Sequence, residues 1–165
     1  MNELMSQLVP IKITVNGDII QKLVEPNQHL TDFLRMELGL TGSHLGCEHG
    51  VCGACSVRVD GQVIRGCLML ASQIDGASIE TIEGVVESGE AARLIEVFVE
   101  KNALQCGFCT PGIILTVLEI LDEKEPLSRA EIRDELSGNI CRCTGYQAII
   151  DAVESVISER MKEGY

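Results

Sequence analysis

Basic residues are scarce in this chain and are outnumbered by acidic ones. It has 13 Lys and Arg against 25 Asp and Glu, which gives a formal net charge of −12 at pH 7. Because the phosphate backbone repels such a chain, the sequence predicts no nucleic-acid partner. No apolar run is long enough to cross a bilayer, so we also predict no membrane span.

Two familiar sequence patterns are missing as well. There is no G-x-G-x-x-G fingerprint, so we predict no flavin or nicotinamide site and no substrate pocket within this chain. The N-terminal residues Met1 to Met5 lack a basic stretch followed by an apolar core. That absence predicts no secretory signal peptide and a cytoplasmic location.

Cysteine is too sparse for a scaffold held together by disulfides. Eight cysteines in 165 residues amount to about 5%, below the roughly 8–10% typical of such scaffolds. Without export, disulfides are further disfavoured, since thiols inside cells are kept reduced. The spacing of the cysteines is therefore the feature that needs an explanation.

Four cysteines lie in or just after a glycine-rich stretch, residues 46–55. Their spacing is the C-x4-C-x2-C…C pattern of plant-type ferredoxins. Glycine permits the positive φ angles that a loop around an inorganic core needs, and free amide N–H groups there can donate to cluster sulfurs. A four-cysteine zinc site is an alternative, although such sites usually present two short-spaced pairs. The ligands predicted for a [2Fe–2S] cluster are Cys47, Cys52, Cys55 and Cys67.

The other four cysteines form a C-x2-C motif at 106–109 and a C-x-C motif at 141–143. Each motif precedes a predicted helix, whose N-terminus carries partial positive charge and free N–H groups. Anionic thiolates are stabilised there, so we expect all four to converge where the two helices begin. A C-x2-C motif alone could be a redox disulfide, but the added C-x-C motif favours a second [2Fe–2S] cluster. Its predicted ligands are Cys106, Cys109, Cys141 and Cys143.

The first half of the chain has the pattern of a small sheet with one helix. The turn dipeptides Asn16-Gly17 and Asp60-Gly61 are typical of two-residue hairpins. Each lies between two segments in which apolar and polar residues alternate. We therefore predict a β-grasp ferredoxin domain over residues 1–84. Its expected elements are hairpins at 11–24 and 56–65, a helix at 31–38 and a last strand at 79–82.

The second half changes to apolar residues at helical spacing. Thr110-Pro111 is a typical helix start, and Ser128 with Glu131 forms a capping-box pattern. We therefore predict an α+β chain whose residues 85–165 form a four-helix bundle with its own [2Fe–2S] cluster. The expected helices are at 90–103, 110–123, 128–138 and 146–161.

Three motifs together resemble a known family. They are G-C-E-H-G-V-C-G-A-C at 46–55, Q-C-G-F-C-T-P-G at 105–112 and G-N-I-C-R-C-T-G-Y at 138–146. This combination is similar to the small iron–sulfur subunit of the molybdenum hydroxylases, the family of xanthine dehydrogenase, aldehyde oxidoreductase and carbon monoxide dehydrogenase. The resemblance covers residues from about 11 to 160 and all eight cysteines. Ser56 stands where the family often has Thr.

The resemblance implies an electron-transfer subunit of an oxidoreductase that has no catalytic residue of its own. In the family, a large subunit binds a molybdopterin cofactor and hydroxylates the substrate with oxygen from water. Electrons then pass to the cluster of the helical domain, to the plant-type cluster and usually to FAD on a medium subunit. The residues matching Gln105 and Cys143 lie against the pterin, which implies that Cys143 is both an iron ligand and the point of electron entry.

Five other residues receive weaker assignments. His44 and His49 flank the first loop, but four cysteines already suffice, so we predict no histidine ligand of the Rieske kind. His29 is expected to be an ordinary loop residue. Arg142 and Thr144 are expected to order the second loop through hydrogen bonds.

A different class of function stays open, namely a stand-alone two-cluster carrier or redox sensor. The helical domain favours the enzyme subunit, because a soluble carrier needs no second cluster beside a pterin-contact motif. The substrate would be bound by a different chain, and this sequence identifies neither the substrate nor the terminal electron acceptor.

Overall fold

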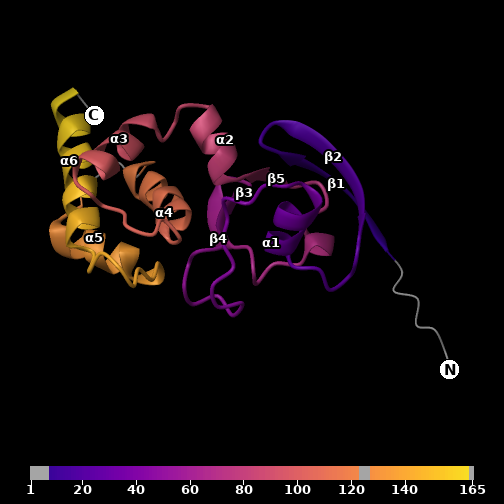
Figure 1. The fold of residues 1–165 in the computed structure, drawn as a ribbon. Coiled ribbons are helices and arrows are strands. Elements are labelled where there is room, and N and C mark those ends of the chain that lie inside the picture. Colours follow the sequence, from indigo (N-terminus) through magenta and orange to yellow (C-terminus); the bar gives the residue numbers. More distant parts are fainter. Residues whose placement is uncertain (1–7, 123–126, 164–165) are drawn as a thin grey trace.

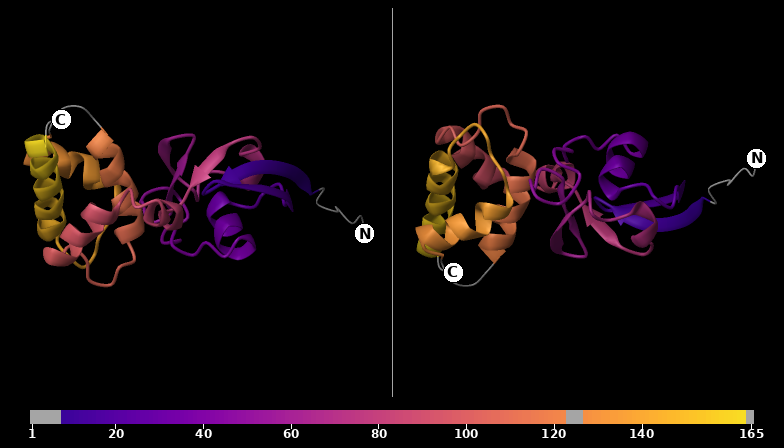
Figure 2. Two further views of the ribbon diagram at one scale, coloured as in Figure 1. Left: turned by 90° about the horizontal axis from the view of Figure 1, so that it is seen from above. Right: turned by 90° about the horizontal axis from the view of Figure 1, so that it is seen from below.

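The computed structural model describes residues 8–122 and 127–163, which form a five-stranded sheet followed by helices (Figures 1 and 2). The predicted α+β architecture is confirmed. The residues on which the signal-peptide prediction depends, and the predicted helix end at Glu123, lie outside the described residues. Across the described ranges, no helix has both the length and the apolar character needed to cross a membrane.

The sheet consists of two hairpins joined through a short fifth strand. The strand order is β2-β1-β5-β3-β4, in which β5 runs parallel to β1 and every other neighbouring pair is antiparallel. Asn16 and Gly17 have φ angles of 50° and 90°, and Asp60 and Gly61 have 48° and 83°, so both predicted two-residue turns are confirmed. The strands are β1 (Val9–Val15), β2 (Asp18–Val24), β3 (Ser56–Val59), β4 (Gln62–Arg65) and β5 (Ser78–Glu80).

The predicted helix at 31–38 is present but is not a regular α-helix. It begins as α1 (Leu30–Asp32) and continues as a π-helical segment over Phe33–Glu37. Beyond its end, the φ of 71° at Gly39 lets the Leu40 N–H reach back to the Leu34 carbonyl over 2.9 Å. The segment lies against the sheet (Figure 1) and contributes to a core that contains Ile13, Leu30, Phe33, Leu34, Val57, Ala71 and Ile79. A 3₁₀ turn at Ala71–Gln73 closes this core.

The last strand is shorter than predicted, and a helix that was not predicted follows it. β5 ends at Glu80, because the Thr81 N–H donates to Asn16 Oδ1 over 2.9 Å and leaves the sheet ladder. The chain then turns into α2 (Ile82–Glu87). The prediction of a strand through Ile82 was therefore wrong in its last two residues.

All four predicted helices of the second half are present. They are α3 (Ala92–Glu100), α4 (Thr110–Asp122), α5 (Arg129–Glu135, extended by a 3₁₀ turn over Leu136–Gly138) and α6 (Gln147–Glu163). The predicted capping box is confirmed, since the Glu131 N–H donates to Ser128 Oγ over 3.4 Å and the Ser128 N–H donates to Glu131 Oε2 over 2.7 Å. α4 lies at the centre and buries most of its side chains.

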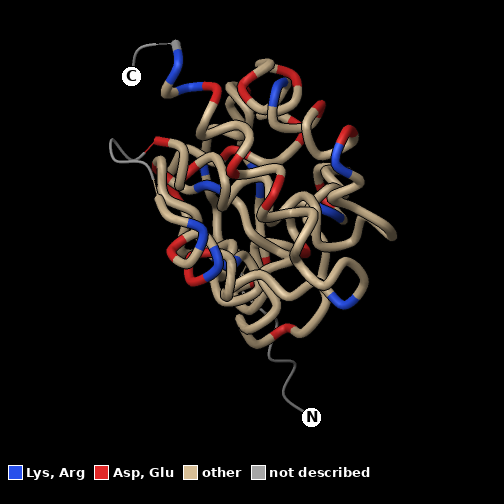
Figure 3. Tube along the Cα trace, turned by 90° about the vertical axis from the view of Figure 1, so that its left-hand side faces the viewer, with Lys and Arg blue, Asp and Glu red and all other residues tan. Residues whose placement is uncertain are grey.

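Acidic and basic residues lie close to one another at several places along the chain trace (Figure 3). Arg93 on α3 pairs with Glu159 on α6 over 2.7 Å, and Arg129 on α5 pairs with Asp151 on α6 over 2.7 Å. Exposed pairs of this kind stabilise a protein little, so helix packing depends mainly on the apolar core.

Two hydrophobic cores meet along one boundary. One core lies under the sheet, and the other lies among the helices and includes Val85. α4 contacts β3 and β4, and Val63 of β4 packs against the helical core. This boundary places the two cysteine-bearing regions close to each other.

Candidate metal centres

The first cysteine set lies on the loop that leads into β3, with its last member just after β4. Gly50 and Gly53 in this loop have φ angles of 82° and 72°, which glycine adopts without strain. The Cys52 N–H lies 3.4 Å from Cys47 Sγ and donates to it. The loop thus wraps its own thiols. Cys47 and Cys52 are half-buried, whereas Cys55 and Cys67 are buried.

Amide N–H groups and burial act in opposite directions on these thiols. Hydrogen bonds from the backbone N–H groups of His49 and Cys52 lower the pKa of Cys47 to about 6. Burial, together with the hydrogen bond to Cys55, raises the pKa of Cys67 to about 11. A buried thiol with a high pKa becomes a thiolate when it binds a metal. Cys47 therefore ionises readily, whereas Cys67 needs the positive charge of a bound metal to become a thiolate.

The second cysteine set converges at the N-terminal ends of α4 and α6. The Sγ atoms of Cys106 and Cys143 are 3.6 Å apart, and the thiols of Cys109 and Cys141 interact with each other. Cys109 directly precedes α4, and its carbonyl accepts from the Ile113 N–H over 3.0 Å. The four sulfurs therefore meet where two helices begin, as the motifs predicted.

The threonine of the second loop orders one of these thiols. Thr144 Oγ1 lies 3.1 Å from Cys141 Sγ, and the Thr144 N–H donates to the same sulfur over 3.5 Å. Burial raises the pKa of Cys141, but these hydrogen bonds more than offset it, and the pKa of the thiol is lowered. Burial raises the pKa of Cys109 to about 12. The side chain of Arg142 is exposed and makes no hydrogen bond within the described ranges, so the predicted ordering role holds for Thr144 and not for Arg142.

One side of the second centre faces outward. Gln105, Cys106 and Cys143 are all exposed, whereas Cys109 is half-buried and Cys141 is buried. The predicted pterin contacts, Gln105 and Cys143, therefore lie on the open side of the set.

The chemistry of the donors fits two [2Fe–2S] clusters. All eight cysteines are free thiols. Nowhere in the described part of the chain do three His, Cys, Asp or Glu side chains surround one point as ligands of a single ion. A [2Fe–2S] cluster needs only two thiolates on each iron. The sulfurs meet in such pairs, which are Cys47 with Cys52, Cys55 with Cys67, Cys106 with Cys143 and Cys109 with Cys141.

Two of the three histidines contact a backbone carbonyl oxygen through a ring nitrogen, and His29 is bonded through its backbone. His44 Nδ1 lies 2.9 Å from the Phe108 carbonyl oxygen. His49 Nδ1 contacts the carbonyl oxygen of Cys47. His29 caps the start of α1, where its carbonyl accepts from the Phe33 N–H over 3.0 Å.

Two polar residues that lie between the cysteine loops belong to no motif that predicts a role for them. Arg65 donates to Ser56 Oγ over 2.5 Å and to the Gly138 carbonyl over 2.8 Å. Asn139 is only 1% exposed. Each stands two residues before a cysteine, but proximity to a ligand is too common a feature to predict such contacts.

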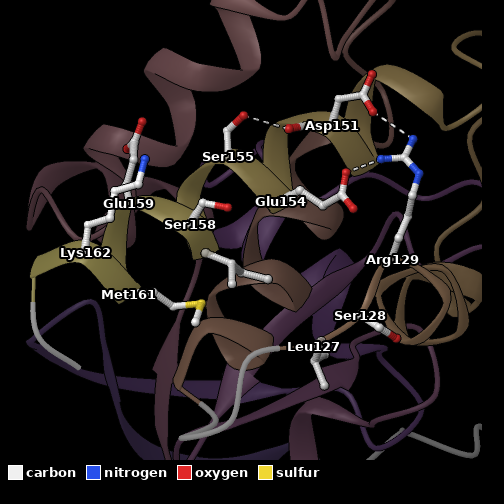
Figure 4. Close-up of a pocket in the computed structure, with 11 residues that line it drawn as sticks. Leu127, Ser128, Arg129, Asp151, Glu154, Ser155, Ser158, Glu159, Met161 and Lys162 are labelled. Carbon is white, nitrogen blue, oxygen red and sulfur yellow. Dashed lines mark hydrogen bonds and ion pairs between the residues drawn. The ribbon is translucent and has the colours of Figure 1, made fainter.

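The hollow drawn in Figure 4 lies elsewhere, between the start of α5 and the outer side of α6. At one end of it, Arg129 pairs with Asp151 and Glu154. No cysteine lines it, so it belongs to the packing of the helices and not to either candidate centre.

Two families of cluster-binding domains match the chain in series. Residues 13–82 match the 2Fe-2S iron-sulfur cluster binding domain, and residues 81–154 match the [2Fe-2S] binding domain. Both descriptions agree with the cofactors that the cysteine spacing predicted.

Individual proteins match over nearly their whole length. The chain is 52% identical over 149 residues to caffeine dehydrogenase subunit gamma from Pseudomonas sp. strain CBB1, covering 88% of this chain and 89% of that protein. It is 42% identical to the xanthine dehydrogenase iron-sulfur-binding subunit from Escherichia coli O157:H7, covering 90% and 94%. It resembles a chain in the crystal structure of quinoline 2-oxidoreductase from Pseudomonas putida 86, with a TM-score of 0.88 and 48% identity over 96% of this chain and 99% of that one.

The order of the domains, the likeness over whole subunits and the two thiol sets agree on one relationship. The chain belongs to the family of small iron–sulfur subunits of the molybdenum hydroxylases.

Proposed function

We propose that this chain carries electrons within a molybdenum hydroxylase, from a large subunit that holds the molybdopterin cofactor towards FAD on a medium subunit. The observation that carries the proposal is the presence of two complete four-thiol sets on adjoining loops of one small chain. When bound, the two clusters supply a pair of one-electron carriers. Substrate chemistry belongs to the large subunit, and this chain has no catalytic residue in the proposed function.

The eight cysteines are the proposed ligands, two on each iron. Contacts between sulfurs support Cys106 with Cys143, and Cys109 with Cys141, as the pairs of the second cluster. The same reasoning supports Cys47 with Cys52, and Cys55 with Cys67, in the first. Backbone N–H groups that donate to Cys47 and Cys141 would favour the thiolate form and temper the negative charge of a bound cluster.

Electrons are proposed to enter on the open side of the second thiol set. Cys143 is exposed and would serve both as an iron ligand and as the point of entry. Gln105 is exposed beside Cys106 and has the hydrogen-bonding groups needed to bind a pterin. The large subunit would cover both residues.

Two smaller proposals complete the assignment. We place the domain boundary after Gly84, because Val85 already belongs to the helical core and Ile79 still belongs to the core under the sheet. We also place the protein in the cytoplasm, where thiols stay reduced, since all eight cysteines are free.

Anaerobic purification of the tagged chain from its native host tests the function. We expect a large molybdenum-containing subunit to co-purify, and the small chain to hold about four irons and four sulfides, two per cluster. A chain purified alone with full iron content would support the stand-alone carrier. Zinc in place of iron would contradict both functions.

A further inference from the structure

Asn139 is a buried residue whose backbone and side chain both form hydrogen bonds. Its backbone N–H donates to the Leu136 carbonyl over 3.0 Å, and its backbone carbonyl accepts from the Tyr146 hydroxyl over 3.0 Å. Its Oδ1 lies 3.0 Å from Thr116 Oγ1, and its Nδ2 donates to the Gly53 carbonyl over 3.4 Å. The Gly53 carbonyl oxygen can only accept a hydrogen bond, so the Nδ2 side of the Asn139 amide must face it.

These partners come from three separate segments. Gly53 stands between two cysteines of the first set, and Thr116 lies on α4, two turns beyond Cys109. Asn139 stands two residues before Cys141. One amide therefore ties the loop of one thiol set to the loop and the helix of the other.

Two glycines allow this contact to be close. A Cβ atom on Gly112 would lie 2.2 Å from the Gly53 carbonyl oxygen. A Cβ atom on Gly53 would lie 2.5 Å from the Gly138 carbonyl oxygen and 2.7 Å from Asn139 Nδ2. Only glycine fits at either position without moving the backbone, so the two loops meet through their main chains.

The contact also aligns a direct link between the two thiol sets. The Ile140 N–H donates to the Cys52 carbonyl over 2.8 Å. Ile140 is bonded to Cys141, so a path with a single hydrogen bond and otherwise only covalent bonds connects a thiol of the first set to a thiol of the second. Electrons tunnel more readily along such a bonded path than across a gap of the same length.

We propose that Asn139 is a positioning residue for electron transfer between the two clusters, because it holds the Ile140–Cys52 hydrogen bond in place. The inference rests on the proposed function. With both clusters bound, the Cys106 set would hold the electron donor and the Cys47 set the acceptor. The step would move one electron, so that one cluster is oxidised and the other reduced, with no bond formed or broken and no proton released.

The test uses the assembled holoenzyme with three substitutions. Asn139→Asp has nearly the same shape but replaces the amide donor that faces Gly53 with an acceptor. Thr116→Val removes the hydroxyl that faces Asn139 Oδ1, and Thr116→Ser keeps that hydroxyl as the matched control. Iron content and the two separate electron paramagnetic resonance signals report whether each cluster is present. The spin–spin splitting between the two reduced clusters, and hydrogen exchange of the Ile140 amide, report on their alignment.

We expect Asn139→Asp to keep both signals and full iron but to lose the splitting, slow electron transfer between the clusters and speed exchange at Ile140. Thr116→Val should weaken the splitting in part, and Thr116→Ser should match the wild type. If both clusters are present and the splitting is unchanged in Asn139→Asp and Thr116→Val, the proposal is overturned. If both substitutions instead abolish the second cluster, Asn139 is a residue of loop folding and the proposal is again overturned. Absence of either cluster from the wild type would contradict the proposed function itself.

A fourth substitution approaches the same contact from the first turn of α4. Gly112→Ala should push the Gly53 carbonyl away, because the added Cβ would lie 2.2 Å from that oxygen but 3.3 Å from Asn139 Nδ2. Loss of the splitting with both clusters present is the expected result. An unchanged splitting would show that the spacing of the loops does not govern the coupling and would overturn the proposal.

Discussion

His44 and Phe108 stack on each other across the two cysteine loops, with ring centroids 4.6 Å apart and ring planes inclined by 19°. His44 stands three residues before Cys47, and Phe108 stands directly before Cys109. The His44 ring nitrogen also meets the Phe108 carbonyl over 2.9 Å. The pair is therefore a contact between the two candidate centres that involves no proposed iron ligand.

Phe108→Ala should destabilise the holoprotein modestly while both clusters stay bound. A stacked aromatic pair contributes about 0.5–1.5 kcal/mol beyond its buried area, and in a protein of this size 1 kcal/mol shifts Tm by about 2–4 °C. We therefore expect Tm, followed by the visible circular dichroism of the clusters, to fall by a few degrees. Phe108→Tyr keeps the ring and should behave as the wild type. Equal Tm values for the alanine and tyrosine variants would show that the stack contributes nothing.

Arg65→Lys should destabilise the contact between the loops even though the charge is kept. The guanidinium of Arg65 reaches Ser56 Oγ and the Gly138 carbonyl together, and a single ammonium cannot reproduce that fork. A hydrogen bond from a charged donor contributes about 1.5–3 kcal/mol, so the variant should unfold at lower denaturant concentration. Lys22→Arg, at an exposed position on β2, is the control for exchanging the two basic side chains. An unfolding midpoint equal to that of the wild type would contradict the assigned role.

The two clusters should be lost independently. Cys52→Ser is expected to remove only the cluster of the first loop, and Cys109→Ser only that of the second, because the thiol sets lie on different loops. Electron paramagnetic resonance of the reduced protein should show one of two signals missing in each variant.

Misfolding must be separated from a direct effect on the ligands, since a bound metal group also stabilises its loop. Ser43→Ala, at a buried polar position near the first loop, serves as the control and should keep both signals. If either cysteine variant remained folded by far-ultraviolet circular dichroism and yet lost both signals, the assignment of separate ligand sets would be wrong.

Gln105→Ala should leave both clusters and the assembly of the enzyme intact. The side chain is exposed in this chain and is not a proposed iron ligand. Loss of one neutral hydrogen bond costs about 0.5–1.5 kcal/mol, which is small against a subunit interface of the usual size. Rapid mixing with substrate should show slower reduction of the iron–sulfur clusters, with reduction of molybdenum little changed. Gln21→Ala, which removes the same type of side chain at an exposed position on β2, is the control. Equal cluster reduction in both variants would leave Gln105 as a surface residue without a role in electron entry.

Some parts of the sequence predicted the structure well because their signals are local. A dipeptide such as Asn16-Gly17 specifies its hairpin through backbone angles that few other residues adopt. The Ser128 capping box likewise marked the start of α5 through bonds within one turn. The prediction that the strand continues through Ile82 was wrong because the Thr81 N–H donates to the side chain of Asn16, 65 residues away. No local sequence pattern reveals such a partner.

The sequence by itself determined the two cysteine sets, the α+β architecture and the family, because ligand spacing, turn residues and helix caps act within a few residues of one another. Only the tertiary structure decided how the two sets face each other. The contacts of Asn139 with Gly53 and Thr116, and the stack of His44 on Phe108, join residues that are remote along the chain. Such contacts form only once both cores have packed, since the fold as a whole, and not any short segment, sets the separation of the two loops.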